Sequence, residues 1–226
     1  MSRGWTAPAG AGVPIVTGDT KVVGRGAADR LFVITAGLGR RLPGSSPTAA
    51  GARSGDAVLM SGPIGCHGVT VLSTREGLGF EADVTSDSRP LHRLVAMMVA
   101  AGGADLHTLR DPTRGGLAAA LNEIAAASSV GVRVEEKALP VPEPVRAACE
   151  MLGLDPAYVA NEGCLVAFVA PGAAGRVLSA MRQMPEGRDA VRIGTVLAGG
   201  PVLVRTAIGS QRVLDMPLGE HLPRIC

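Results

Sequence analysis

The chain has 226 residues, of which 46% are hydrophobic and 19% charged, a composition typical of a globular protein with a sizeable core. Its net charge of +2 comes without a run of like charges or a long apolar stretch, which argues against a nucleic-acid-binding stripe and a membrane span. The cysteines, at positions 66, 149, 164 and 226, form no CxxC pair, and residues 1–12 do not resemble a signal peptide, so we expect reduced thiols in the cytoplasm.

The predicted elements alternate between strands and helices. Apolar runs predict strands at 13–16, 21–23, 31–35 and 58–61, and helical spacing of apolar residues then predicts helices at 67–76 and 91–101. A helix that opens at 111–116 follows, then a strand at 130–134, a helix at 143–152, a strand at 165–169 and a helix at 173–184. Strands at 191–197, 202–206 and 211–214, joined by hairpins, complete the order. This pattern predicts an α/β (α+β) layered sandwich with a mixed sheet.

The first 42 residues differ from the rest because their predicted strands have no helices to cover them. A sheet must bury its apolar face, so residues 1–42 are predicted to belong to a neighbouring domain or to pack on another chain. Residues 43–226 are predicted to form one α/β domain that ends in a mobile tail.

A polar turn between the first two strands, residues 17–21, carries a carboxylate and an ammonium. Asp19 is suited to bind Mg²⁺, and Lys21 is suited to meet a phosphate or to act as a base. Lys21 is one of only two lysines in a chain that otherwise uses arginine, which draws attention to it. The alternative is a plain polar hairpin turn, and these residues alone favour neither.

The stretch from Asp111 to Gly116 opens the predicted helix with a pair of glycines. Such a helix start exposes backbone N–H groups to an anion, and Arg114 adds a guanidinium suited to phosphate. The alternative is an N-cap in which Asp111 or Thr113 accepts hydrogen bonds from the first-turn amides. The two interpretations are compatible, and the sequence favours a phosphate contact.

Two further loops carry polar residues next to glycines. Glu162, between Asn161 and Gly163 at the entrance of a strand, is suited to metal binding or base chemistry, although these residues alone favour a plain polar turn. The loop at 62–68 leads into a helix and contains Cys66, whose pKa the helix start could lower, and His67, which is either a ligand residue or a structural histidine.

The last four residues, Pro-Arg-Ile-Cys, place a thiol on a short terminal arm. Pro223 restricts the backbone, and the cation of Arg224 favours the thiolate of Cys226. We therefore expect Cys226 to be the nucleophile, with Cys149 and Cys164 as core residues and Cys66 as its one rival. The alternative is that the last residue is incidental.

Four stretches together resemble the hydrogenase maturation proteins of the HypE family. They are Val13–Val23, Asp111–Leu117, Ala160–Gly163 and Pro223–Cys226, in that order and at that spacing. The resemblance runs from Val13 to Cys226, and the terminal Pro-Arg-Ile-Cys separates HypE from the wider group that includes aminoimidazole ribonucleotide synthetase and selenophosphate synthetase.

This resemblance implies a PurM-like C-terminal domain at 43–226 and, at 1–42, a remnant of an N-terminal ATP-binding domain. It implies that Cys226 accepts a carbamoyl group from the carbamoyltransferase HypF, and that ATP drives dehydration of that group to a thiocyanate. The cyano group would then pass to iron on the HypC–HypD scaffold during [NiFe] hydrogenase assembly. Lys21 and Glu162 match positions implicated in the dehydration. The residues that would surround Mg-ATP are Asp19 (also a Mg²⁺ ligand), Asp111, Thr113, Arg114 and Asn161.

Members of the HypE family are longer at the N-terminus and dimerise through the first domain, so the resemblance implies an N-terminally truncated chain. The chain also has Cys66 where the family usually has Asp. Two other functions therefore stay open: a non-catalytic module that accepts the carbamoyl group or binds partners, and another ATP-dependent synthetase of the same fold.

Overall fold

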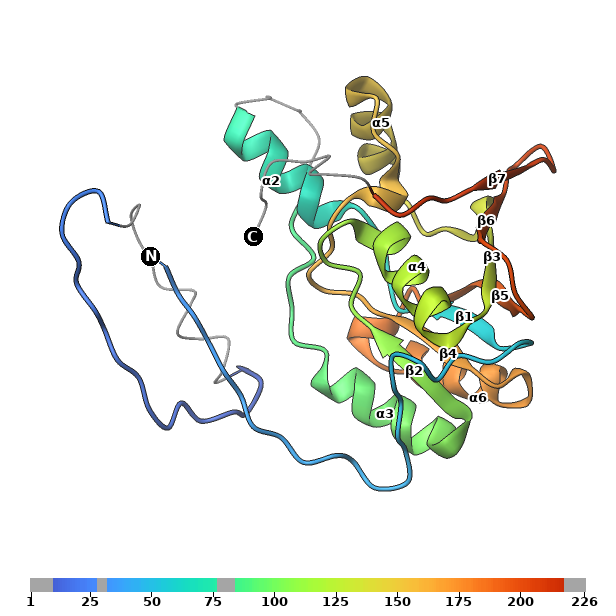
Figure 1. Cartoon of the computed structure of the whole chain (residues 1–226), viewed down its shortest axis with the longest axis horizontal. Coiled ribbons are helices and arrows are strands. Elements are labelled where there is room, and N and C mark those ends of the chain that lie inside the picture. Colours follow the sequence, from blue (N-terminus) through green and yellow to red (C-terminus); the bar gives the residue numbers. More distant parts are fainter. Residues whose placement is uncertain (1–9, 28–31, 77–83, 218–226) are drawn as a thin grey trace. The chain divides into compact units, whose positions relative to one another are not determined.

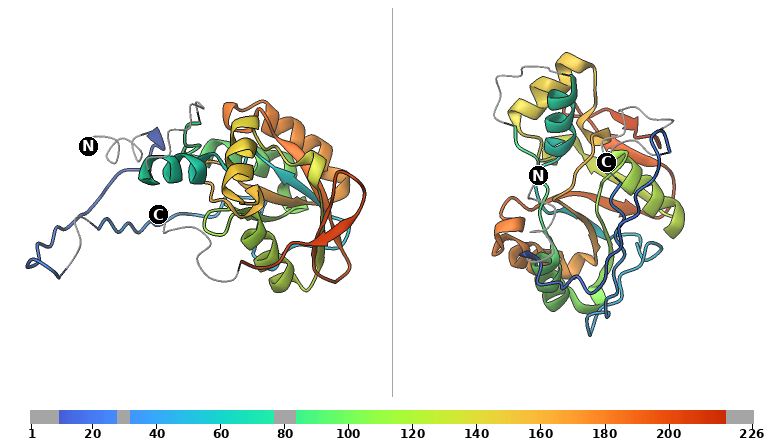
Figure 2. Two further views of the ribbon diagram at one scale, coloured as in Figure 1. Left: turned by 90° about the horizontal axis from the view of Figure 1, so that it is seen from above. Right: turned by 90° about the vertical axis from the view of Figure 1, so that its left-hand side faces the viewer.

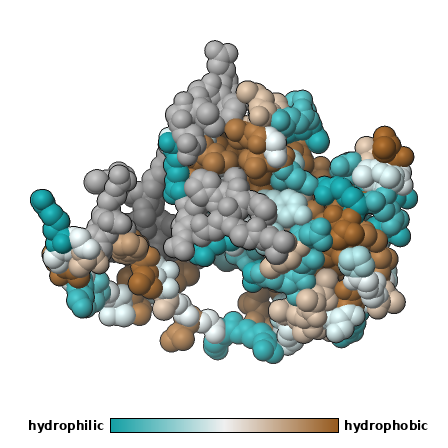
Figure 3. Space-filling view, turned by 45° about the horizontal axis from the view of Figure 1, so that its top comes forward, coloured by the Kyte–Doolittle hydropathy of each residue, from teal (hydrophilic) through white to brown (hydrophobic). Residues whose placement is uncertain are grey.

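The computed structural model describes residues 10–27, 32–76 and 84–217, and it divides the chain into two units, Met1–Arg41 and Leu42–Cys226. In the first unit, residues 13–24 and 32–41 have no regular secondary structure, so the strands predicted there are wrong. Their apolar side chains, such as Val16, Val22 and Ile34, are exposed, and Figure 3 shows hydrophobic surface along this segment. A strand needs a hydrogen-bonded neighbour, and the described part of the chain supplies none here.

The second unit is built on a seven-stranded mixed sheet with the order β2-β4-β1-β5-β3-β6-β7 (Figure 1). The strands are β1 (Ala57–Met60), β2 (Leu106–Arg110), β3 (Gly131–Glu135), β4 (Val166–Val169), β5 (Val191–Leu197), β6 (Val202–Arg205) and β7 (Gln211–Val213). Strands β3 and β6 pair in parallel, and the other pairs are antiparallel. Of the last three strands only β6 and β7 form a hairpin, because β5 lies between β1 and β3.

The helices are α2 (Cys66–Glu76), α3 (His92–Gly102), α4 (Gly116–Ser128), α5 (Glu143–Leu152) and α6 (Pro171–Arg182). Short 3₁₀ turns occur at Gly103–Asp105, Glu136–Ala138, Pro156–Tyr158 and Pro185–Gly187. These helices confirm the five predicted from the sequence: the bounds of α5 agree with the prediction, and those of α2, α3 and α6 differ from it by one or two residues. Within the described ranges no helix is both long and apolar enough to cross a membrane.

Helices cover both faces of the sheet, and the alternation of side chains along β1 and β4 explains why. On one face Val58, Met60 and Phe168 pack against α4 through Leu117 and Leu121. On the other face the neighbouring residues of the same two strands pack against α3 and α6, with Leu59, Ala167, Leu94, Met98, Val177 and Met181. Since successive residues of a strand point to opposite faces, a central strand covered on both sides is apolar throughout, as the fully buried β1 is.

Helices α2 and α5 form a separate pair with a small core of its own. They lie side by side in both views of Figure 2, and Val69 of α2 shares a cluster with Val145, Ala148 and Cys149 of α5. Val159, in the segment that precedes β4, completes this cluster. The pair is thereby fixed to the same chain segment that carries Asn161 and Glu162.

Candidate functional site

Asn161 joins three loops that the sequence analysis selected independently. Its side chain is completely buried: Oδ1 accepts a hydrogen bond from the N–H of Gly65 at 2.7 Å, and Nδ2 donates to the carbonyls of Pro112 and Val159, both at 2.9 Å. The glycine-rich loop at 62–68 and the Asp111–Gly116 stretch are thus tied to the turn that contains Glu162. Because both amide hydrogens are used, a direct contact of this amide with a nucleotide would require the loss of one of these bonds.

The turn at Glu162 is held by a segment that the sequence analysis did not select. The carboxylate of Asp87 accepts hydrogen bonds from the backbone N–H groups of Glu162, at 3.2 and 3.3 Å, and of Gly163, at 2.8 Å. Arg89 donates through Nε to the carbonyl of Gly163 at 2.8 Å. A Cβ on Gly163 would lie 1.6 Å from the carbonyl oxygen of Asp87, so only glycine permits this approach. The one sequence signal was a polar run, Thr85 to Arg89, directly before α3.

The start of α4 has the properties expected of an anion site. Gly115 and Gly116 both adopt left-handed backbone conformations, with φ of 72° and 62°, and no side chain caps the helix, so the N-cap by Asp111 or Thr113 is wrong. Within the described ranges, the N–H groups of Leu117 and Ala118 have no hydrogen-bond acceptor. Leu117 and Ala118 are only 1% and 0% exposed, so these amides are closed to solvent, and the helix start offers an anion the positive end of its dipole.

The side chains around this helix start are largely accessible. Asp111 and Arg114 are exposed and Thr113 is half-buried, and none of the three forms an ion pair with another described residue. The guanidinium of Arg114 is therefore free to bind an anion, and the carboxylate of Asp111 is free to bind a cation.

The described cysteines are poor nucleophiles. Burial and the nearby carboxylate of Asp87 raise the pKa of the half-buried Cys66, so the expectation that the helix start lowers it is wrong. Burial raises the pKa of Cys149 to about 11 and strongly raises the pKa of Cys164. Both residues are about 1% exposed, which confirms that they belong to the core.

His67, next to Cys66, binds the same segment as the Glu162 turn. Its Nδ1 lies 2.9 Å from Oγ of Ser86, and its Nε2 is a buried atom without a hydrogen-bond partner among the described residues. The histidine thus connects the first turn of α2 to residues 86–89.

The remaining candidates lie elsewhere in the chain. Asp19 and Lys21 belong to the first unit, where both are exposed and Asp19 Oδ1 accepts a hydrogen bond from the N–H of Thr20 at 2.8 Å. Cys226 lies outside the described residues. Within the described ranges, no three His, Cys, Asp or Glu side chains are grouped so that they could hold a metal ion.

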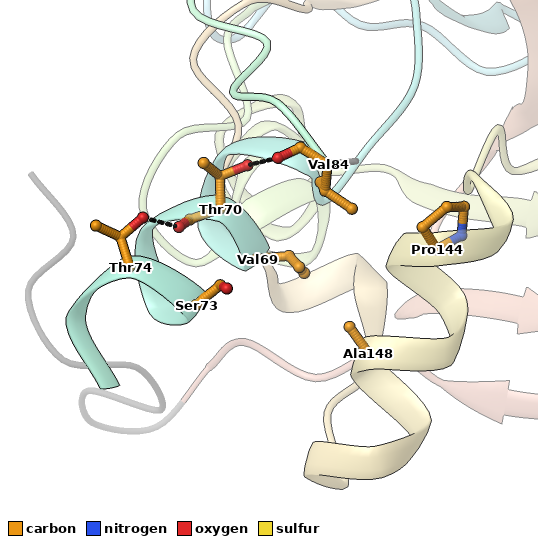
Figure 4. A pocket seen from close by; sticks show the side chains of 7 residues that line it. All are labelled: Val69, Thr70, Ser73, Thr74, Val84, Pro144 and Ala148. Carbon is orange, nitrogen blue, oxygen red and sulfur yellow. Dashed lines mark hydrogen bonds between the residues drawn. The ribbon is translucent and has the colours of Figure 1, made fainter. Parts of the chain in front are cut away.

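A cavity of about 80 Å³ lies between α2 and α5 (Figure 4). Val69, Thr70, Ser73 and Thr74 line it from α2, with Val84 beside them and Pro144 and Ala148 opposite, from α5. The hydroxyls of Thr70 and Thr74 are bonded to backbone carbonyls of the same region. Ligand pockets usually measure about 300–1,000 Å³, so this cavity is too small for a nucleotide.

Comparison with known families assigns most of the second unit to one family. Residues 53–205 match the family model of the AIR synthase related protein, C-terminal domain. The chain belongs to the AIR synthase related family. The matched range contains Asp87, Asp111–Gly116 and Asn161–Gly163, so the site described above lies within the family domain, whose fold is PurM-like.

Within this family, the chain is similar to HypE proteins both in sequence and in structure. It is 56% identical over 218 residues to the carbamoyl dehydratase HypE of Azotobacter vinelandii, a match that covers 96% of this chain and 64% of that protein. Its structure is similar to that of the hydrogenase maturation protein HypE in complex with ATP, with a TM-score of 0.85 and 46% identity over 98% of this chain and 68% of the other. It is also similar to HypE from a HypE–HypF complex, with a TM-score of 0.86 and 39% identity over 94% and 70% of the two chains.

The chain therefore spans less than two thirds of the length of the curated relatives that it matches.

Proposed function

We propose that this chain carries the C-terminal domain of a carbamoyl dehydratase that acts in [NiFe] hydrogenase maturation. The observation that carries the proposal is the 56% identity to a carbamoyl dehydratase HypE across 96% of the chain. The uncapped start of α4 supports it, since a reaction driven by ATP needs a place for transferred phosphate.

In the proposed reaction, the thiol of Cys226 carries a carbamoyl group as a thiocarbamate. The carbamoyl oxygen attacks the γ-phosphorus of ATP and ADP leaves. One N–H proton is lost to a base, and loss of the second N–H proton then expels phosphate and leaves a carbon–nitrogen triple bond. The balance is thiocarbamate plus ATP giving thiocyanate, ADP and phosphate. The cyano group of the thiocyanate is the proposed donor for the active-site iron.

The residues divide into two sets by their chemistry. Arg114 would bind phosphate, with Thr113 beside it, because its guanidinium is an exposed donor at the positive end of a helix. Asp19 would bind the Mg²⁺ of Mg-ATP, since carboxylates are its usual protein ligands, and Asp111 would lie beside the nucleotide. When bound, Mg²⁺ would neutralise charge on the phosphates.

Glu162 and Lys21 are the proposed bases that remove the N–H protons. Glu162 is half-buried on a turn fixed by Asp87, which suits a base that must keep its geometry. We propose that Asn161 supports nucleotide binding by holding the loop of Pro112 against the glycine-rich loop.

The proposed partners are the carbamoyltransferase HypF, which supplies the carbamoyl group, and the HypC–HypD scaffold, which receives the cyano group. A structure of a HypE–HypF complex similar to this chain supports the first of these. We further propose that the protein forms a homodimer and works in the cytoplasm, where its thiols stay reduced.

A second candidate function is a module that accepts the carbamoyl group without dehydrating it. It is favoured by the irregular backbone and exposure of residues 13–24, which carry Asp19 and Lys21. A third, less supported candidate is another ATP-dependent synthetase of the same fold.

Mass mapping of the C-terminal peptide separates these functions. The chain is first incubated with the partner carbamoyltransferase and carbamoyl phosphate. In a second step, the dehydration step, one portion of the sample receives ATP and the other does not. A carbamoyl dehydratase adds the mass of a carbamoyl group to the Cys226 peptide and then loses the mass of one water when ATP is present. Carbamoylation without water loss would identify the acceptor module, and modification that persists in Cys226→Ala would contradict both.

A further inference from the structure

We propose that Asp87 is the positioning residue of Glu162. Its carboxylate binds backbone N–H groups of the turn that carries this proposed base, and it does not itself touch the reacting atoms. This inference rests on the proposed function for its catalytic consequence, while its structural part can be tested without any activity.

The contacts of Asp87 converge on the backbone of Glu162 and Gly163. Its two carboxylate oxygens lie 3.2 and 3.3 Å from the amide nitrogen of Glu162, and one of them lies 2.8 Å from the amide nitrogen of Gly163. A carboxylate that accepts two successive amides fixes the two peptide planes on either side of the Glu162 Cα, because each N–H lies in its own peptide plane. The direction in which the Glu162 side chain leaves the backbone is thereby fixed as well.

Arg89 completes this arrangement from the same segment. Its Nε donates to the carbonyl of Gly163, and its terminal nitrogen donates to the carbonyl of Glu186 at 3.0 Å. The turn is therefore bound on its N–H side by Asp87 and on its C=O side by Arg89. Gly163 also packs directly against the Asp87 backbone, since a Cβ there would lie 1.6 Å from the Asp87 carbonyl oxygen.

Asp87 can act as a support because its own segment is anchored to the rest of the domain. Ser86 lies within hydrogen-bond distance of His67, and the carbonyl of Val84 accepts a hydrogen bond from Thr70 at 3.1 Å, so residues 84–89 are attached to α2. A displacement of about 1 Å at a reacting group can cost up to about 10²-fold in rate. The position of Glu162 thus depends on a carboxylate 75 residues away in the chain.

The structural part is tested by amide hydrogen exchange, followed by NMR in ¹⁵N-labelled protein. In Asp87→Ala, exchange of the Glu162 and Gly163 amides should accelerate by about tenfold or more, because both lose a charged acceptor. In Asp87→Asn, which keeps one acceptor oxygen and the shape, the effect should be smaller, and this variant also covers the case in which Asp87→Ala does not fold. The matched control is Asp105→Ala, which removes an exposed carboxylate paired with Arg176 and should leave both amides unchanged.

The catalytic part is tested on the same variants in the mass-mapping assay. Asp87→Ala should retain carbamoylation of Cys226 but slow the ATP-dependent loss of water by about tenfold or more, with little change in the KM for ATP. Asp87→Asn should recover part of the rate. Unchanged exchange at Glu162 and Gly163 would overturn the positioning role whatever the activity, as would a faster exchange that leaves water loss unaltered. A wild-type chain that never loses water would refute the proposed function, and the exchange data alone would then decide the role of Asp87.

Discussion

Replacing Asn161 by alanine should destabilise the domain, because this side chain links the three loops of the candidate site. Three side-chain hydrogen bonds are lost, to the N–H of Gly65 and to the carbonyls of Pro112 and Val159. The Pro112 carbonyl keeps a second bond, from the backbone N–H of Asn161 at 3.2 Å, so two groups remain without a partner. A buried polar group left unpaired costs about 1–3 kcal/mol, so the free energy of unfolding should fall by about 3 kcal/mol.

The measurement is urea unfolding followed by far-ultraviolet circular dichroism, with the free energy taken from the midpoint and slope. Asn122→Ala is the matched control, because its half-buried amide donates only to the carbonyls of Ala118 and Leu214. The Ala118 carbonyl keeps its helical hydrogen bond from the Asn122 N–H in α4, so only the Leu214 carbonyl loses its partner, and the control should lose about 1 kcal/mol. A loss below about 1 kcal/mol for Asn161→Ala, or equal losses for the two variants, would refute the reasoning.

Three further predictions concern backbone space, protonation and charge. Gly163→Ala should lower the melting temperature sharply because its Cβ would collide with Asp87, whereas Gly175→Ala, with open space around it in α6, should add about 0.5–1 kcal/mol of stability. Burial raises the pKa of Cys149 to about 11 in the folded chain, whereas the pKa of an unfolded cysteine is about 8.5. The neutral thiol therefore contributes its full stabilisation below the unfolded pKa, and this stabilisation is lost as pH rises towards the folded pKa. Chemical unfolding at pH 7.5 and 10 should therefore show a loss of about 2 kcal/mol that Cys149→Ala lacks; an identical slope with pH in both proteins would contradict it. Arg114→Ala should weaken ATP binding by about 1.5–3 kcal/mol in isothermal titration, and an unchanged affinity would exclude a phosphate contact.

Local patterns predicted most elements of the second unit. The helix predicted at 143–152 and the strand predicted at 191–197 have these bounds in the structure, and their apolar residues recur at helical and strand spacing. Strand β2 was missed because His107, Thr108 and Arg110 interrupt its apolar pattern, although His107 and Thr108 are buried. Burial of a polar residue depends on partners distant in sequence, such as Asp56, which lies 2.8 Å from His107.

The strands predicted at 13–16 and 21–23 show the converse error. Their apolar runs have the composition of strands, but pairing is a property of two segments, and the described residues include no second segment for them.

The candidate site was predictable where the chemistry lies within a few consecutive residues. The glycine pair at the start of α4 indicated an anion site, and Glu162 was recognised from its neighbours. Asp87 was not found, because its role lies in two bonds to a turn 75 and 76 residues away. The role of Asn161 as a link between loops was likewise invisible, since Gly65 is 96 residues distant.

The sheet order also constrains when this domain can fold. Strand β1, at residues 57–60, is fully buried, yet its two neighbours are β4, at 166–169, and β5, at 191–197. During synthesis, more than 100 residues must follow β1 before its first partner exists. Pairing across such separations is slow, and an apolar strand with both edges open is prone to aggregate. Nascent chains that end before β5 should therefore depend on chaperones, and cooperative folding should begin only after β5 has left the ribosome.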